Sequence, residues 1–335
     1  MQLSGSGFSG SLLGPTLTIS TNVHAKLKKG LRDVSFRNIP HRIAVDDSNM
    51  IDISAIRFEM TPGKAEFSDS VIVKDVEGDL RADIITIGLQ NEEGLIQSIK
   101  AFGNIEVESK HISISNEHVD SMASYDMESG SVVLKGNPSW RMGDRFGRAN
   151  SIMINRESMI ISAEGDVEME VPSSGKEGAL FQFNSSVNSV NTSKSMPLII
   201  SSSYFVFEPA RKKKKGYARY IGSVKLKRGS TQLDCQYLNF VMSGVGKEEK
   251  LDDARATGVD LYQGDDRLTS NIFFYDFEQG RMLLELSPNW SLEGQNGNAK
   301  KVEFHTKSGK FLAQGDVEME LTKTKSINSL FLPLN

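Results

Sequence analysis

Apolar and polar residues alternate along most of this chain, and such alternation predicts β-strands with one buried and one solvated face. Val167, Met169 and Val171, for example, alternate with Glu168 and Glu170. Runs of this kind return about every 8–12 residues, and Gly, Asn, Asp and Pro separate them, a spacing typical of all-β sandwiches, barrels and rolls. The pattern therefore predicts an all-β chain of antiparallel strands with little helix.

Residues 248–256 form a segment whose pattern fits two structures. Their sequence, Glu-Glu-Lys-Leu-Asp-Asp-Ala-Arg-Ala, has the composition of a short helix. The same residues align with 95–101, which looks extended. Helix and strand both stay open for this segment.

A long stretch of sequence occurs twice. Residues 122–171 and 272–321 align without gaps and share about 17 identical residues in 50, which marks a duplicated unit. A looser match upstream extends both copies, so we divide the chain into five parts. These are a partial N-terminal β unit at 1–55, a first unit at 56–172, a Ser- and Asn-rich connector at 173–202, a second unit at 203–322 and a C-terminal tail at 323–335.

Each copy carries the same short motif near its end. Gly165-Asp166 and Gly315-Asp316 are turn signals, and an alternating strand follows each of them. We therefore expect each copy to end in a short, half-buried strand that a tight turn precedes. The acidic residues of these strands are expected to form a solvated face: Glu168, Glu170, Glu318 and Glu320.

Composition and charge narrow the class of protein. The chain has 335 residues, 38% of them hydrophobic, and a net charge of −4, so the basic face typical of nucleic-acid-binding proteins is not expected. No run reaches the ~18 apolar residues that a membrane-spanning helix needs. Residues 1–8 have neither a basic nor an apolar segment, so no signal peptide is predicted in the chain as given. Because residues 17–27 already alternate, we expect the chain to begin within an earlier β unit.

The chain lacks the motifs of common catalytic, metal and cofactor sites. Cys235 is the single cysteine, so no disulfide is predicted, and this residue is expected to fill space in a strand. The five histidines show no metal-site spacing, and no phosphate loop or nucleophile elbow is present. Most of the paired acids fall in turn contexts. We predict no enzymatic activity, no metal and no cofactor.

Two further features each allow a structural and a functional interpretation. Trp140 and Trp290 follow proline at matching places, where core packing near a turn is the first interpretation and the lining of a ligand groove is the second. The chain also has one cluster of consecutive basic residues. The first interpretation of this cluster is a basic loop between strands, and the second is a binding site for an anionic lipid headgroup or phosphate. The cluster consists of Arg211, Lys212, Lys213, Lys214 and Lys215.

The repeated motifs resemble a known family. Tyr125-Asp126, Gly130, the Val132-Val-Leu-Lys-Gly-Asn-Pro138 segment and the Ala163-Glu-Gly-Asp-Val167 segment are similar in order and spacing to the OstA-like family. These are the LptA- and LptC-type periplasmic proteins of lipopolysaccharide transport. The resemblance implies two tandem open β-jellyroll units, each with two antiparallel sheets that splay along one edge.

The resemblance differs in strength between the two copies. Residues 65–171 match the family pattern closely. Residues 217–321 match it more loosely, because Leu286-Ser287 stands where Gly136-Asn137 would.

The resemblance also implies a function, that of a non-enzymatic protein carrying lipopolysaccharide acyl chains in a groove between sheets toward the outer membrane. The implied partners are lipopolysaccharide or lipid A, homologous jellyrolls that dock by edge strands, and an inner-membrane ABC transporter. The implied location is the periplasm, within the cell envelope. Two alternatives stay open: a β-rich structural scaffold with a closed core, and a carbohydrate-active or carbohydrate-binding β-module.

Alternation identifies the candidate wall of such a groove. Full burial of an acyl chain gains ~0.8 kcal/mol per CH₂, so a dozen carbons would bind with about 10 kcal/mol, too tightly for a carrier. The wall is therefore expected to bury hydrocarbon only in part, with adaptable side chains such as Met and Val. The candidate wall residues are Val71, Val73, Ile105, Val107, Val167, Met169, Val224, Leu226, Val317 and Met319.

Overall fold

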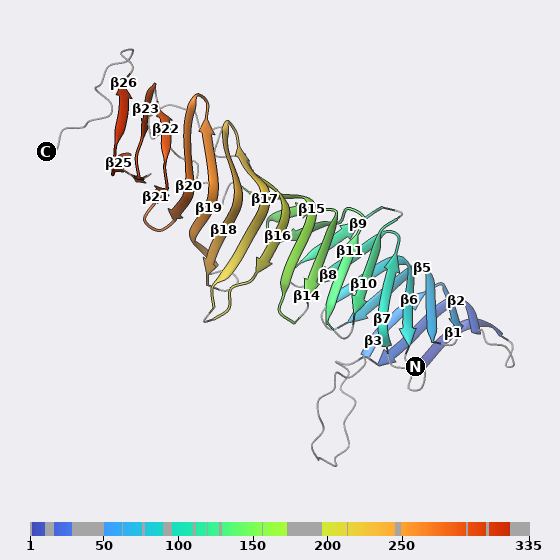
Figure 1. The fold of residues 1–335 in the computed structure, drawn as a ribbon. Coiled ribbons are helices and arrows are strands. Elements are labelled where there is room, and N and C mark those ends of the chain that lie inside the picture. Colours follow the sequence, from blue (N-terminus) through green and yellow to red (C-terminus); the bar gives the residue numbers. More distant parts are fainter. Residues whose placement is uncertain are drawn as a thin grey trace. The chain divides into compact units, whose positions relative to one another are not determined.

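The computed structural model of the protein describes residues 2–10, 17–28, 50–61, 63–75, 78–89, 96–109, 112–118, 120–126, 129–155, 157–172, 196–212, 214–244, 249–292, 294–305 and 308–321. These residues form 26 strands and no helix, so the expectation of an all-β, jellyroll-like chain is confirmed. None of them forms a helix that is long and apolar enough to cross a membrane. The chain divides into two compact units, Met1–Val167 and Glu168–Asn335 (Figure 1).

The first unit combines a few long strands with many shorter ones. They are β1 (Gln2–Gly10), β2 (Leu17–Lys28), β3 (Met50–Ala55), β4 (Arg57–Thr61), β5 (Lys64–Asp75), β6 (Gly78–Leu89), β7 (Ile96–Phe102), β8 (Ile105–Ser109), β9 (Ser113–Asn116), β10 (Met122–Asp126), β11 (Ser131–Lys135), β12 (Ser139–Met142), β13 (Arg145–Arg148), β14 (Ser151–Asn155) and the start of β15 (Ile160–Val171).

The second unit follows with longer strands first. They are β16 (Leu198–Glu208), β17 (Gly216–Arg228), β18 (Thr231–Ser243), β19 (Lys250–Gln263), β20 (Asp266–Asp276), β21 (Arg281–Glu285), β22 (Asn289–Leu292), β23 (Gln295–Asn298), β24 (Lys301–His305), β25 (Lys310–Gln314) and β26 (Glu318–Leu321). Strand β16 begins inside the range predicted as the connector. The rest of that connector, 173–195, and the predicted tail lie outside the described residues.

Long strands of the first unit bend, so that one strand lies in two antiparallel sheets. Strand β5 pairs with β4 over residues 64–68 and with β3 over residues 72–74. The front sheet, as we name it, has the order β4-β5-β6-β7-β10-β11-β14-β15. The back sheet has the order β3-β5-β6-β8-β9-β12-β13. Strand β2 extends both sheets, because it pairs with β3 and with β4.

The second unit repeats this arrangement. Each strand from β16 to β20 lies with one half in the front sheet and with the other half in the back sheet. The front sheet continues as β20-β21-β24-β25. The back sheet continues as β20-β22-β23-β26.

Residues with left-handed backbone conformation bend the strands between the two sheets. The pairs Gly103-Asn104, Gly136-Asn137 and Gly165-Asp166 have φ values of 66° and 41°, 99° and 63°, and 76° and 47°. Glycine adopts this conformation without a Cβ penalty, and Asn and Asp tolerate it better than other residues do. Backbone hydrogen bonds join neighbouring bends, with Gly103 N donating to Ser121 O at 3.1 Å and Asn150 N donating to Gly165 O at 2.8 Å.

These bends correct the interpretation of the repeated Gly-Asp motif. Gly165-Asp166 does not form a tight turn between two strands, because it lies inside β15, which is continuous from Ile160 to Val171. In the second copy, β25 ends before Gly315-Asp316 and β26 begins after it. The physical reason is that Gly165-Asp166 forms a bulge after the residues that pair with β14, which bends the strand while the chain stays extended.

The core of each unit lies between its two sheets. In β5, Ala65 and Phe67 of the front half and Val71 and Val73 of the back half are exposed by at most 6%. In the second unit the ring of Trp290, on the back sheet, makes a T-shaped contact with Phe311 on the front sheet, with ring centroids 5.3 Å apart. This contact spans the space between the sheets, so their inner faces meet.

The helical alternative for residues 248–256 is wrong over its described part. Residues 250–263 form β19, which pairs with β18 and β20 on its two sides. Leu251, Ala254 and Ala256 are buried in this strand. The hydrogen bonds and packing of a strand between two neighbours outweigh the helix propensity of Glu, Lys and Ala.

Candidate functional site

The ten predicted groove-wall residues differ in burial. Seven of them are exposed by only 0–6%: Val71, Val73, Ile105, Val167, Met169, Val224 and Leu226. Val107 is half-buried. Val317 and Met319 are exposed by 47% and 46%. The apolar interior is therefore closed at most of these positions and reaches solvent beside β26.

The last two described strands end the two sheets of the second unit. Among the described strands, β25 pairs only with β24, and β26 pairs only with β23. Phe311 and Ala313 are half-buried here, whereas Val317 and Met319 are exposed. We call these four residues the open end. An exposed apolar surface beside unpaired strand edges is typical of a place where a ligand or another chain binds.

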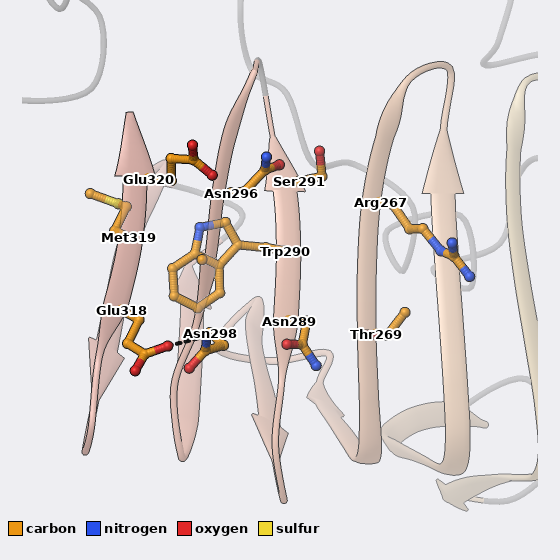
Figure 2. A pocket seen from close by; sticks show the side chains of 11 residues that line it. Arg267, Thr269, Asn289, Trp290, Ser291, Asn296, Asn298, Glu318, Met319 and Glu320 are labelled. Carbon is orange, nitrogen blue, oxygen red and sulfur yellow. Dashed lines mark hydrogen bonds between the residues drawn. The ribbon is translucent and has the colours of Figure 1, made fainter. Parts of the chain in front are cut away.

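A cavity of about 710 Å³ lies against the back sheet of the second unit (Figure 2). In β20, buried Leu268 separates Arg267 from Thr269, so these two side chains point away from the core. The pairing of β22, β23 and β26 places six further residues on the same outer side: Asn289, Ser291, Asn296, Asn298, Glu318 and Glu320. Trp290, Gly297 and Met319, which alternate with them, complete the lining.

Hydrogen bonds fix Arg267 and Glu318, two of the three charged residues of this cavity. Arg267 donates from Nε and Nη2 to the two carboxylate oxygens of Asp260, at 2.8 and 2.5 Å. Asn298 Nδ2 donates to Glu318 Oε2 at 3.1 Å. Among the described residues, three further lining side chains make no hydrogen bond or ion pair: Thr269, Ser291 and Asn296. The guanidinium charge is thus neutralised, while uncharged donors and acceptors remain available to a ligand.

The first unit has a smaller cavity, of about 260 Å³, on the same face of its back sheet. Its lining is more charged and consists of Asp79, Arg81, Glu106, Glu108, Ser113, Ile114, Ser115, Ser139, Trp140, Arg141 and Phe146. Arg81 Nη1 lies 3.1 Å from Glu106 Oε2. Sequence reasoning missed this face, although a signal was present in the repeat. Ser139, Arg141, Phe146 and Arg148 of the first copy correspond to Asn289, Ser291, Asn296 and Asn298 of the second.

Both tryptophans are buried, as the first interpretation of the sequence expects. Trp140 is exposed by 1% and Trp290 by 5%. Each stands across from a glycine of the neighbouring strand, Gly147 and Gly297 respectively. Four residues of the duplicated motif thereby form two equivalent packing pairs.

The basic cluster is partly neutralised within the fold. Lys214 pairs with Glu208, and Lys215 Nζ lies 3.0 Å from Asp252 Oδ2. The hydrogen bond and charge of Asp252 raise the pKa of Lys215. Lys212 is exposed, Arg211 also has an interaction partner, and Lys213 lies outside the described residues. The described part of the cluster therefore presents less free positive charge than its sequence indicates.

Two groups with raised pKa values lie in the second unit, the buried Cys235 and the half-buried Tyr262. Burial and the charge of Asp234 raise the pKa of the Cys235 thiol to about 12. Burial, followed by a hydrogen bond to Asp234, raises the pKa of Tyr262 to about 12. Both groups are protonated at neutral pH, so neither is an activated nucleophile there.

Comparisons with known proteins show a distant likeness to solved structures. No family model matches the chain, and no curated protein matches it. Among solved structures, the chain is similar to LptH, the LptA-homologous periplasmic component of the lipopolysaccharide transport device from Pseudomonas aeruginosa. The likeness has 18% sequence identity and a TM-score of 0.26, and it covers 38% of this chain and 95% of that one.

Proposed function

We propose that this chain is a non-enzymatic lipid-binding protein of the bacterial envelope, which carries lipopolysaccharide acyl chains toward the outer membrane. The observation that carries the proposal is the open end, where Val317 and Met319 expose the apolar lining of a two-sheet roll. Removing apolar surface from water is favourable by about 25 cal/mol per Å², so hydrocarbon gains free energy by covering these residues.

Burial within the units limits how lipid would bind. The inward residues of the middle strands, such as Ile105 and Leu226, are fully buried without a ligand. An acyl chain would therefore lie at the open end, or would separate the two sheets against the cost of opening a packed core. Both routes keep binding well below the ~0.8 kcal/mol per CH₂ of complete burial, which suits a protein that must release its cargo.

The same strands offer a place for partners. The outer edges of β25 and β26 have no described neighbour, and such edges accept a strand from another chain. Homologous jellyrolls, and through them an inner-membrane ABC transporter, are the proposed partners, and the periplasm is the proposed location. Lys212 and Arg211 are the proposed contacts for an anionic headgroup, together with the paired Lys214 and Lys215.

A structural scaffold is the second candidate function. The observation that favours it is the complete burial of most inward residues, because a filled core stabilises a fold and leaves no space for a guest. In that case the open end would serve only as a contact between chains. Lipid binding and chain association therefore have to be measured separately.

A double substitution at the open end tests the proposal. Val317→Asp with Met319→Glu places two charges on the apolar surface, and each position is already half exposed, so the fold is expected to persist. Binding of detergent-free lipid A, followed by native mass spectrometry, should fall at least about ten-fold. Glu320→Gln, on the other face of the same strand, is the matched control and should leave binding unchanged. Equal binding by the double variant would favour the scaffold.

A further inference from the structure

The outer face of the second unit's back sheet carries a cavity that shares only Met319 with the open end. We propose that this face binds a neutral oligosaccharide. The cavity, of about 710 Å³, falls within the ~300–1,000 Å³ range of ligand sites. Its polar side chains come from four neighbouring strands (Figure 2), and the pairing of these strands places them on the outer side of the sheet.

The chemistry of the lining matches that of sugar hydroxyl groups. A hydroxyl group donates one hydrogen bond and accepts others, and side-chain amides and hydroxyls do both in the same way. Thr269, Ser291 and Asn296 offer such groups with no described partner, and Asn289 and Asn298 lie beside them. Asn289 uses only its Nδ2, which donates to Ser287 O at 3.0 Å, so its amide oxygen has no hydrogen bond with any described residue.

Other ligand classes fit this face less well. A phosphate or another anion needs free positive charge, but Arg267 is held by both carboxylate oxygens of Asp260, and Glu318 and Glu320 lie on the same face. An acyl chain needs mainly apolar contacts, and only Trp290 and Met319 offer apolar side chains among the eleven lining residues. A metal ion needs converging ligands, and no group of three such side chains exists among the described residues.

The two copies of the duplicated unit agree at the inward positions of these strands and differ at the outward positions. Both copies keep Trp and Gly at the inward positions, Trp140 with Gly147 and Trp290 with Gly297. The outward positions differ, because the second copy has Asn or Ser where the first has Ser139, Arg141, Phe146 and Arg148. A solvated face that only had to stay soluble could keep its charges. Of the four, Arg141 and Arg148 are charged, and the second copy has Ser291 and Asn298 in their places. This difference points to recognition of an uncharged, hydroxyl-rich ligand.

Calorimetric titration of the full chain tests this inference. The probes are the β-1,4-linked hexamers of glucose and of N-acetylglucosamine, with dextran sulfate as an anionic comparison. We expect at least one neutral hexamer to bind with a Kd below about 1 mM, and dextran sulfate not to compete. Ser291→Ala with Asn296→Ala should weaken binding at least about ten-fold, because each change removes hydrogen bonds to the ligand. The matched control, Ser113→Ala with Ser115→Ala on the first unit's face, should have no effect.

Three outcomes would overturn it. The first is that neither neutral hexamer binds, and the second is that only dextran sulfate binds. The third is that the Ser291 and Asn296 double variant binds a hexamer as well as the unchanged chain does. Circular dichroism of the double variant shows whether it is folded, and both residues lie on the solvent side of their strands. The titrations contain no lipid, so their result is independent of lipid A binding at Val317 and Met319.

Discussion

The indole ring of Trp290 covers Gly297 on the neighbouring strand so closely that no side chain fits between them. A Cβ atom at Gly297 would lie 2.2 Å from Cζ2 and 2.5 Å from Cε2 of the ring, and 2.8 Å from the carbonyl oxygen of Glu318. The glycine leaves space, and the ring shields the backbone that the glycine exposes. This packing explains why the duplicated motif keeps its tryptophan and its glycine together.

Gly297→Ala should therefore destabilise the second unit by about 2 kcal/mol, because the added methyl group displaces the ring or the strand. Urea unfolding in a Trp140→Phe background measures this, since Trp290 is then the single tryptophan. Asn296→Ala, at the neighbouring exposed position, is the control and should change stability by less than about 0.5 kcal/mol. Equal midpoints for the two variants would contradict the close contact.

Leu286→Gly should stabilise the second unit by about 0.5–1 kcal/mol. Leu286 and Ser287 both have a φ of 63°, a conformation that costs a non-glycine residue about 1–2 kcal/mol. Leu286 is exposed by 57%, so little burial is lost, and the greater freedom of glycine in the unfolded chain offsets part of the gain. The measurement is the urea midpoint. The reverse change, Gly136→Leu, should destabilise the first unit, because a Cβ there would lie 3.1 Å from Ser121 Cα and φ is 99°.

The strands were predictable from sequence, because an alternating pattern encodes a half-buried strand directly. The bends were only partly predictable. Gly-Asn and Gly-Asp pairs indicate left-handed conformations, but the same pairs also occur in hairpin turns, so the sequence alone predicts a turn at Gly165-Asp166. Leu286-Ser287 adopts the same bend without a glycine, and both carbonyl oxygens accept hydrogen bonds there, from Asn271 N at 3.4 Å and from Asn289 Nδ2 at 3.0 Å.

The candidate sites were less predictable than the fold. The alternation of residues along each strand identifies which side chains face inward, but it does not say whether an inward side chain contacts another side chain or solvent. Met169, which is buried, and Met319, which is exposed by 46%, show this difference. The outer cavity was missed because polar residues on a strand look like an ordinary solvated face. Only the pairing of β20, β22, β23 and β26 brings Thr269, Ser291 and Asn296 to one surface.

The contact between Lys215 and Asp252 should make stability depend on pH in acid. Burial favours the neutral form of Asp252 and acts to raise its pKa. Hydrogen bonds from Ser243, at 2.6 Å, and from Lys215, together with the positive charges of Lys215 and Lys250, outweigh this effect, so the pKa of Asp252 is lowered. The ionised carboxylate therefore stabilises the fold above its unfolded pKa, and this contribution disappears as the pH falls through the folded value. A double-mutant cycle of Lys215→Met and Asp252→Asn should give about 0.5 kcal/mol of coupling at neutral pH. Coupling of the same size below the folded pKa would contradict this assignment.

Cys235 should react slowly with thiol reagents until the second unit opens. Its pKa of about 12 keeps the thiol protonated, and its side chain is buried, so both the nucleophile and access to it are lacking. An aromatic disulfide reagent should label native Cys235 at least about a hundred-fold more slowly than the unfolded chain. A Cys235→Ala, Lys212→Cys variant supplies an exposed thiol for comparison. Equal labelling rates for the two native proteins would show that Cys235 is accessible.

Photo-crosslinking from single positions tests the central claim most directly, that hydrocarbon contacts the apolar lining between the sheets. A photoreactive residue replaces Met319 at the open end, Met169 in the closed interior, or Glu320 on the outer face, and each variant is exposed to acyl-labelled lipopolysaccharide. We predict a strong adduct from position 319, a weaker one from position 169 and none from position 320. Absence of adducts from both methionine positions, or an equal yield at position 320, would contradict lipid carriage and leave the scaffold function.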